Sequence, residues 1–248
     1  MRVMILVVAV SALLMHSPSV GRGQDSQIAA EIAANGIEIS LADCGAGGAA
    51  RRDWGVVADP TASTGTAIEH ARATSTEAAE SLAICQSAVL KNGDLSVRFK
   101  AKSGAAYQGG GLALRMATPR DYYLVKVDAL RDRVLLLQVK NGAAEEIVGV
   151  DADVAADVWH TLAVRAQDDG FTVFLDGAWI FTGYDKTFPH AGRIALWAEP
   201  GSITRFDRIT IGPTAKSLSW QQPSIGTDAA AKVEPKQGKM QSPAVAVR

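Results

Sequence analysis

The sequence predicts an all-β protein, folded either as a two-sheet antiparallel β-sandwich or as a barrel. Three observations support this fold class. Short segments alternate apolar and polar side chains, turn-forming dipeptides separate these segments, and no helical period of useful length appears between Trp54 and Gly212. About a dozen short strands joined by tight turns are typical of both architectures.

The segment from Gly93 to Lys102 shows the alternation most clearly. Its apolar residues share one face and its polar residues the other, with Leu95, Val97, Phe99 and Ala101 against Ser96, Arg98, Lys100 and Lys102. This pattern predicts a half-buried antiparallel strand. The alternation recurs at Leu112–Met116, Tyr123–Val127, Leu135–Val139, Leu162–Val164 and Phe171–Leu175.

Asp-Gly and Asn-Gly pairs mark the turns. Asp176-Gly177 lies between two alternating runs and predicts a two-residue hairpin, because a type I′ turn needs positive φ at both positions. Asn92-Gly93 and Asn141-Gly142 punctuate the chain in the same way.

The last predicted strand carries a phase slip. Phe206 and Ile209 are three positions apart, whereas Ile209 and Ile211 are two apart. A β-bulge near Asp207 would keep all three side chains on the core face.

Residues 1–23 have the pattern of a secretory signal peptide. Arg2 precedes an apolar run from Val3 to Leu14, and small residues follow as far as Gly23. A run of about a dozen apolar residues is short for a bilayer crossing, which needs roughly 20, although an uncleaved membrane anchor is the alternative. No later segment is apolar enough to span a membrane, so we expect a periplasmic or secreted protein without a transmembrane segment in the mature chain.

Three segments are expected after the signal peptide. Residues 24–52 form a lead-in, with a short helix within 25–34, a strand at Ile37 to Ile39 and a Gly- and Ala-rich loop from Cys44 to Arg52. Residues 53–212 form the β-sandwich. Residues 213–248 are expected to be a disordered tail, because Pro, Ala, Ser, Gln and Lys dominate there and cannot bury enough apolar surface.

The charge balance excludes one class of partner. The 248 residues carry a formal net charge of -1, which leaves no surplus of Lys and Arg for tracking phosphates. We therefore expect no nucleic-acid partner.

The chain has two cysteines, Cys44 and Cys85. Export would place them where disulfides persist, which favours a bridge between them. The alternative is that Cys85 is a free cysteine within a buried strand, since it ends the apolar stretch Leu82–Cys85.

A succession of five motifs resembles a known family. They are Gly109–Arg115, Asp121–Val125, Val158–Leu162, Phe174–Gly177 and Gly192–Trp197. In this order the chain from about Trp54 to Ile211 resembles the bacterial secreted family of 3-keto-disaccharide hydrolase domains and, more distantly, laminin G-like modules. The resemblance implies a concanavalin A-like jelly roll of the lectin/glucanase type, and thus a sandwich rather than a barrel. Sugar-processing members of the family often carry a polar or aromatic residue beside the arginine that matches Arg115. In this sequence the preceding residues are instead Ala113 and Leu114.

Catalytic machinery is not evident in the sequence. Retaining glucanases of this fold place paired carboxylates on one strand, about 5 Å apart, whereas the acidic pairs at 145–146 and 151–153 adjoin turns. His160 shares the parity of Leu162 and Val164, so it is expected to point inward and to be held by a hydrogen bond rather than to act as a general base. The four histidines lack metal-ligand spacing, so neither a metal nor another cofactor is predicted.

The alternation of faces along the strands selects a candidate ligand site. Five residues are expected to lie away from the core as one solvent-facing patch, and they combine aromatic and charged groups: Arg115, Tyr122, Lys126, Asp128 and Trp197. Sugars are bound by an aromatic platform with polar groups around the hydroxyls. The alternative is structural, with an Arg115–Asp128 cross-strand ion pair and aromatic rings that cover the sheet.

The leading prediction is an exported glycan-binding or surface-interaction module with a possible carbohydrate ligand. A hydrolase or lyase acting on 3-keto-glycosides and a structural envelope protein are the alternatives. The fold does not decide between them, because it hosts lectins, adhesion modules and glucanases alike.

Overall fold

The computed structural model describes residues 36–46, 53–71 and 81–212. The predicted signal peptide, the helix expected within 25–34 and the tail expected at 213–248 lie outside the described residues. Within them the chain is almost entirely β-strand, with one 3-10 helix, η1 (Leu41–Asp43). This part of the chain contains no helix with the length and apolar character that a membrane crossing requires.

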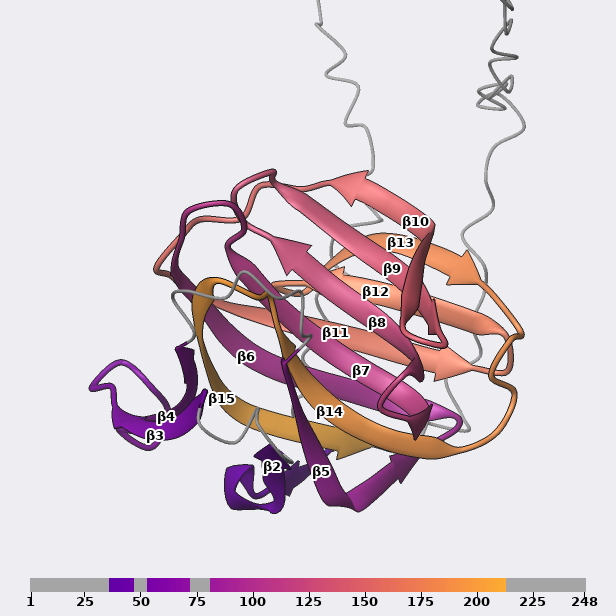
Figure 1. The fold of residues 1–248 in the computed structure, drawn as a ribbon, viewed down its shortest axis with the longest axis horizontal. Helices are drawn as coiled ribbons and strands as arrows, with labels where there is room; N and C mark the ends of the chain where they lie inside the picture. Colours follow the sequence, from indigo (N-terminus) through magenta and orange to yellow (C-terminus); the bar gives the residue numbers. More distant parts are fainter. Residues whose placement is uncertain (1–35, 47–52, 72–80, 213–248) are drawn as a thin grey trace, which may run out of the picture. The chain divides into compact units, whose positions relative to one another are not determined.

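Two antiparallel sheets pack face to face as a sandwich, which confirms the predicted fold class (Figure 1). The eight-stranded sheet has the order β13 (Ala178–Tyr184), β12 (Gly170–Leu175), β11 (Trp159–Gln167), β6 (Gly93–Gly104), β15 (Ser202–Gly212), β4 (Thr66–Ala71) and β3 (Trp54–Ala58), with β1 (Ile37–Ile39) also paired to β15. The seven-stranded sheet has the order β10 (Ala143–Asp151), β9 (Arg133–Lys140), β8 (Asp121–Asp128), β7 (Gly109–Thr118), β14 (Gly192–Ala198), β5 (Ser81–Leu90) and β2 (Cys44–Ala46).

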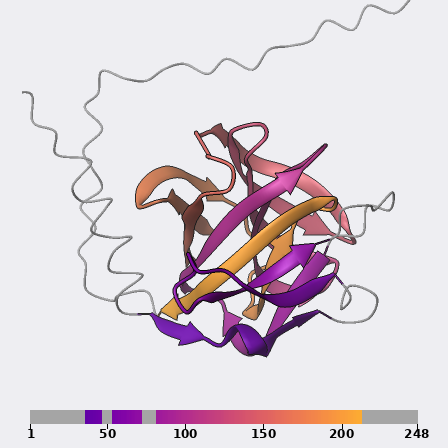
Figure 2. The same ribbon diagram turned by 90° about the vertical axis from the view of Figure 1, so that its left-hand side faces the viewer.

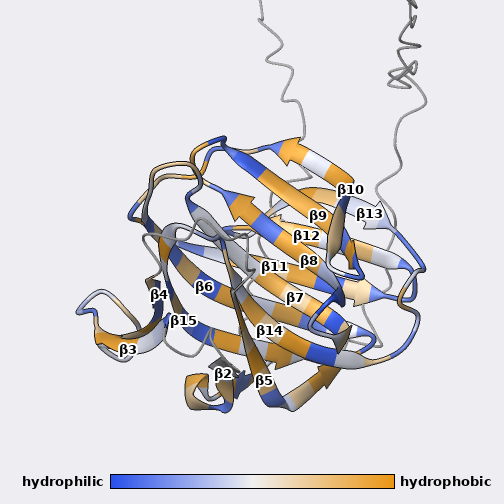
Figure 3. Ribbon diagram, viewed as in Figure 1, coloured by the Kyte–Doolittle hydropathy of each residue, from blue (hydrophilic) through white to orange (hydrophobic). Residues whose placement is uncertain are grey.

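The main core fills the space between the sheets. Side chains of a strand point alternately to its two faces, so the apolar set of each strand meets that of the opposite sheet. Val97 and Phe99 of β6 are completely buried there, as are Leu114 of β7 and Val125 of β8. Figure 3 shows the same alternation as hydrophobic and hydrophilic bands along the strands.

Two of the three predicted turns are confirmed as hairpins, whereas Asn92-Gly93 connects β5 and β6 without positive φ at Asn92. Asp176 and Gly177 have φ of 50° and 82° between β12 and β13, and Asn141 and Gly142 have φ of 54° and 83° between β9 and β10. Positive φ at both central residues is the signature of a type I′ hairpin, whose twist matches that of the strands it joins.

The predicted bulge in the last strand is also confirmed. The register of β15 against β6 shifts between Asp207 and Ile209, and Arg208 at the bulge has a positive φ of 26°. Phe206 and Ile209 are therefore both fully buried, and Ile211 packs against the same core.

Some edge strands of the sandwich precede residue 53, where the sandwich was predicted to begin. The strand expected at Ile37 to Ile39 pairs with the end of β15, and Figure 2 shows it in indigo alongside β15 in orange. The expected loop from Cys44 is wrong for its first residues, which form strand β2 and pair with β5. Cys44 lies directly opposite Cys85, and the predicted disulfide between them is confirmed. This covalent link holds a strand too short to be recognised from its composition.

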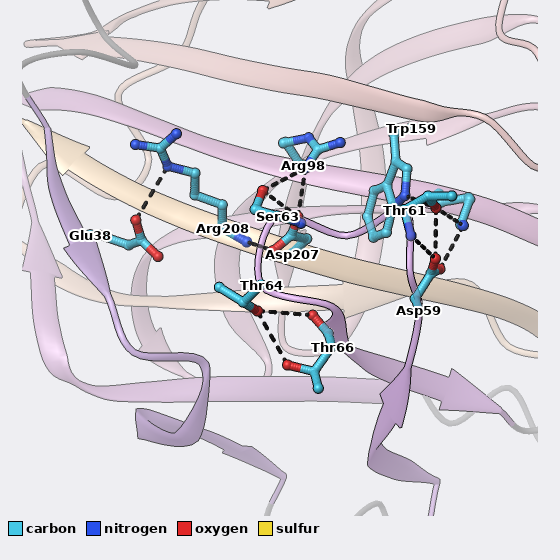
Figure 4. Close-up of polar contacts among 11 residues, drawn as sticks. Glu38, Asp59, Thr61, Ser63, Thr64, Thr66, Arg98, Trp159, Asp207 and Arg208 are labelled. Atoms are coloured by element: carbon cyan, nitrogen blue, oxygen red, sulfur yellow. Dashed lines mark hydrogen bonds and ion pairs between the residues drawn. The ribbon is translucent and has the colours of Figure 1, made fainter.

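A network of polar side chains covers the outer face of the eight-stranded sheet (Figure 4). Thr61 accepts hydrogen bonds from Trp159 Nε1 at 2.8 Å and from Lys100 Nζ at 3.0 Å. Lys100 also forms an ion pair with Asp59 at 2.6 Å, and this contact holds the pKa of the Asp59 carboxyl far below its usual range. The network fixes the segment 59–65 onto strands β6, β11 and β15. Its polar groups form hydrogen bonds and ion pairs with one another.

A second apolar cluster lies on the outer face of the seven-stranded sheet. Ala113, Tyr122, Leu124 and Trp197 alternate with core residues along their strands, so their side chains point away from the main core. They are nevertheless at most 3% exposed. The cluster also contains Leu82, Met116, Val139 and Ala195. This sheet is therefore apolar on both faces, unlike an ordinary solvated sheet.

Candidate functional site

Three neighbouring strands bring Lys126 and Trp197 together at one end of this outer face. Gly111 of β7 pairs with Lys126 of β8 on one side and with Trp197 of β14 on the other. The three residues form a row across the sheet, although β14 is distant from β7 and β8 in sequence. The Lys126 side chain crosses Gly111 and places its ammonium 5.2 Å from the centroid of the Trp197 ring.

The Lys126 ammonium is the centre of the site. Its Nζ donates a hydrogen bond of 2.7 Å to Glu199 Oε2 and lies 6.0 Å from the ring centroid of Tyr107. A cation held near two aromatic rings is attracted by the negative faces of both. Because Glu199 and Trp197 are buried, while Tyr107 is exposed, the ammonium lies at the border between the sheet and the solvent.

A second ion pair adjoins the first. Arg131 Nη1 donates a hydrogen bond of 2.7 Å to Asp128 Oδ2, and its guanidinium lies 4.7 Å from the centroid of the Tyr107 ring. The other oxygen of Asp128 accepts from the backbone N–H of Leu130, which fixes the turn after β8. Tyr107 therefore contacts both cations of the cluster, and we call Tyr107, Lys126, Asp128, Arg131, Trp197 and Glu199 the β8–β14 cluster.

Glycine is required where the cluster crosses β7. A Cβ at Gly111 would overlap the carbonyl oxygen of Val125, and a Cβ at Gly109 would overlap that of Val127. Gly109 pairs with Asp128, and its carbonyl oxygen accepts from the Glu199 backbone N–H at 3.2 Å. The backbones of β7 and β8 thus approach more closely here than a side chain on β7 would allow. At Gly109 and Gly111, β7 therefore places no side chain between strands β8 and β14.

One polar atom of the cluster lacks a partner. The indole Nε1 of Trp197 is buried and has no hydrogen-bond acceptor within the described residues. An N–H removed from water without an acceptor costs free energy, so such a group in a native site calls for an explanation.

Burial also shifts the titration of Glu199. The loss of water around this carboxyl raises its pKa above the usual value, and nearby Asp128 acts in the same direction, although Lys126 opposes the shift. A perturbed carboxyl next to a charge partner is a common property of functional sites.

Arg115 is not part of this cluster, and its predicted solvent-facing position is wrong. The register of β7 against β8 shifts after Leu114, and Arg115 itself has a positive φ of 50°. This bulge turns Arg115 inward and leaves Met116 on the outer face. Simple alternation through the bulge therefore assigned Arg115 to the wrong face.

The Arg115 guanidinium instead joins three turns at the far end of the sandwich. It is 1% exposed, donates to the carbonyl oxygens of Lys91, Asp168 and Phe188, and lies 4.9 Å from the centroid of the Phe171 ring. Its role in the described structure is to hold these turns together.

The other predicted site residues are distributed as follows. Tyr122 shares the outer face with Lys126 but is fully buried in the second apolar cluster rather than solvent-facing. Asp128, which is paired with Arg131, and Trp197, which contacts Lys126 and packs in the second apolar cluster, are also buried. The alternative Arg115–Asp128 ion pair is wrong, since Asp128 faces Gly109 at the opposite end of the β7–β8 hairpin.

His160 is buried and hydrogen bonded, as its parity predicted. Its Nδ1 lies 2.6 Å from Asp176 Oδ2, and its Nε2 lies 2.9 Å from the carbonyl oxygen of Ala155. Over the described ranges no three His, Cys, Asp or Glu side chains gather in a way that could hold a metal ion.

Sequence reasoning missed Tyr107, Arg131 and Glu199. Glu199 follows Trp197 by two positions and so shares its face, a signal that was available in the alternation. Tyr107 and Arg131 lie between strands, where alternation gives no direction. Their contacts depend on how these connections fold over the sheet.

The two sheets and their order define the class of concanavalin A-like jelly rolls. Among solved structures, the chain is similar to the carbohydrate-binding module CBM66 from Bacillus subtilis, with 20% identity over 64% of this chain and 95% of that one and a TM-score of 0.53. It is also similar to the β-glucanase of Bacillus licheniformis, with 14% identity over 66% of this chain and 83% of that one and a TM-score of 0.48. At 20% identity the likeness to the carbohydrate-binding module shows the fold alone.

No protein-family model and no curated protein matches the sequence. The resemblance to the family of 3-keto-disaccharide hydrolase domains therefore stays a prediction.

Proposed function

We propose that the protein is an exported glycan-binding module and that the β8–β14 cluster is its binding site. The observation that carries the proposal is the position of Lys126, whose ammonium contacts Glu199 and two aromatic rings on the outer face of one sheet. Glycan sites combine rings, which pack against the C–H faces of sugars, with charged or amide groups, which bind the hydroxyls.

The exposed ring of Tyr107 supplies the platform in this proposal. It is 42% exposed, and Lys126 and Arg131 hold it at the edge of the cluster. Sugar hydroxyls stacked on this ring would meet the Lys126–Glu199 pair. The shared fold with a carbohydrate-binding module supports the same class of ligand.

Export is part of the proposal. The Cys44–Cys85 disulfide fits an oxidising compartment, where such bonds persist. The signal-peptide pattern predicted at residues 1–23 supports the same location. The mature chain would then meet its ligand in the periplasm or outside the cell.

A glycan array followed by titration calorimetry tests the proposed site. We expect Tyr107→Ala to weaken binding of any glycan found on the array by about fivefold to tenfold, because a stacked ring contributes roughly 1 kcal/mol. Tyr184→Ala is the matched control, since Tyr184 is 69% exposed on the other sheet. Equal loss in both variants, or in neither, would count against the proposed site.

Cleavage of 3-keto-glycosides, as a hydrolase or as a lyase, is a second candidate function. The raised pKa of Glu199 beside Asp128 is the observation that favours it, since a general acid needs a carboxyl that holds its proton to a higher pH than usual. Incubation of the protein with a 3-keto-disaccharide, followed by chromatography of the products, tests this candidate. Turnover that disappears in Glu199→Gln would support an enzyme, and an unchanged substrate would support binding alone.

A further inference from the structure

The charges of the β8–β14 cluster are matched in pairs. Lys126 pairs with Glu199, and Arg131 pairs with Asp128, each at 2.7 Å. Neighbouring Arg133 is paired as well, with Glu146 at 3.2 Å. The two cations and two carboxylates of the cluster therefore cancel, and none of these cations is left without a counter-ion.

We propose that the site selects neutral, hydroxyl-rich glycans over glycans that carry carboxylate or sulfate groups. This inference rests on the proposed glycan-binding function and specifies its ligand class. An anionic ligand would have to approach two carboxylates that are already buried, with side chains 10% exposed at Glu199 and 6% exposed at Asp128. Repulsion between like charges that have lost their water is costly.

The free hydrogen-bonding groups of the cluster match a hydroxyl rather than an anion. Trp197 Nε1 is a buried donor without an acceptor in the described structure. The hydrogen bond that Glu199 accepts from Lys126 is at Oε2, which leaves Oε1 as an acceptor. Lys126 uses one of its three N–H groups in that bond. A sugar hydroxyl donates and accepts at once, so it can serve both kinds of group, whereas a carboxylate or sulfate only accepts.

The exposed part of the cluster fits the same ligand class. Arg131 is the most exposed of the four charged groups, with its side chain 49% exposed, yet it lies against the Tyr107 ring and its Asp128 partner. Its charge is therefore both screened and compensated. The platform that first meets the ligand is a ring rather than a free cation.

Backbone-matched polysaccharides provide the test. Titration calorimetry on the full chain would compare neutral dextran and xylan with carboxymethyl dextran, dextran sulfate and glucuronoxylan. We expect at least one neutral polymer to bind and its charged counterpart to bind about tenfold more weakly. The affinity for the neutral polymer should change little with salt, because paired charges leave little net attraction to screen.

The outcomes separate this inference from the proposed function. If a charged polymer binds more tightly than its neutral counterpart, and Tyr107→Ala abolishes that binding, the glycan site stands and the neutral preference is overturned. If neither kind of polymer binds, both proposals fail.

Two variants test the physical cause of the preference. Glu199→Gln removes one carboxylate and leaves Lys126 uncompensated, so we expect the affinity ratio of charged to neutral polymer to rise about tenfold. Trp197→Phe keeps a ring but removes the N–H, so we expect the neutral polymer to bind about twofold to tenfold more weakly. Trp179→Phe, at an exposed indole of the other sheet, is the control that should not change binding. An unchanged ratio in Glu199→Gln would show that charge pairing does not set the selectivity.

Discussion

The imidazole of His160 is held between two acceptors, the carboxylate of Asp176 at Nδ1 and the carbonyl oxygen of Ala155 at Nε2. A neutral imidazole carries one N–H, so both contacts are hydrogen bonds only when the ring is protonated. The hydrogen bond to Asp176 raises the pKa of His160 above its ordinary value, although burial opposes this shift.

This arrangement predicts a pH-dependent stability. Because the folded pKa of His160 exceeds the unfolded value of about 6.5, the stabilisation is fully present below that value and is lost as the pH rises through the folded pKa. We expect the Tm of the wild type to fall relative to that of His160→Gln from about pH 6 to pH 8. Calorimetry over this range tests the prediction, with exposed His190→Gln as the control. Parallel curves for the wild type and His160→Gln would contradict it.

Arg115→Met is expected to destabilise the sandwich without touching the glycan site. The substitution leaves the carbonyl oxygens of Lys91, Asp168 and Phe188 without their donor, so the free energy of unfolding should fall by about 3 to 5 kcal/mol. Urea denaturation measures this loss, and Arg193→Met, at an exposed arginine of β14, is the control. A folded Arg115→Met protein should retain wild-type glycan affinity. Weaker binding by that folded protein would restore Arg115 to the ligand site.

Removal of the disulfide is expected to loosen the N-terminal edge of the seven-stranded sheet. Cys44 and Cys85 are separated by 41 residues, and a bridge across that distance contributes on the order of 4 kcal/mol by restricting the unfolded chain. We expect the double variant Cys44→Ala, Cys85→Ala to lose about that stability in urea denaturation. In the wild type, thiol labelling after denaturation without reductant should detect no free thiol. Two labelled cysteines would show that the bridge does not form.

Gly111→Ala tests the close approach of β7 and β8. The added Cβ would overlap the Val125 carbonyl oxygen, so the strands must separate and we expect a loss of about 1 to 3 kcal/mol. Gly55→Ala on β3 is the matched control because a Cβ there meets nothing within 4 Å, and its stability should stay the same or rise slightly. Equal stability of both variants would show that β7 tolerates a side chain at this position.

Much of the fold was predictable because it depends on local patterns. Alternation located the strands around Phe99 and Val125, the Asp176-Gly177 pair located a hairpin, and the spacing of Phe206 and Ile209 located a bulge. Each of these signals is contained within a few consecutive residues.

The candidate site was less predictable because it depends on relations between distant strands. Trp197 and Lys126 meet only because β14 inserts beside β7, and no local pattern gives that strand order. The bulge at Arg115 also had no local signal, since arginine is not a residue type that prefers positive φ. Because the bulge turns Arg115 to the core face, its guanidinium lies among the turns at the end of the sandwich opposite the β8–β14 cluster.

The pairing of Lys126 with Glu199, 73 positions apart, also constrains how the protein acquires its function. The β7–β8 hairpin can form early, because its strands are joined by a short turn, but β14 must close a long loop before it docks between β7 and β5. If the hairpin forms first, a partly folded chain would have Lys126 in place without Trp197 or Glu199 beside it. Recognition of a ligand at this cluster would begin only when the sheet is complete, so binding competence would also report that the chain has finished folding.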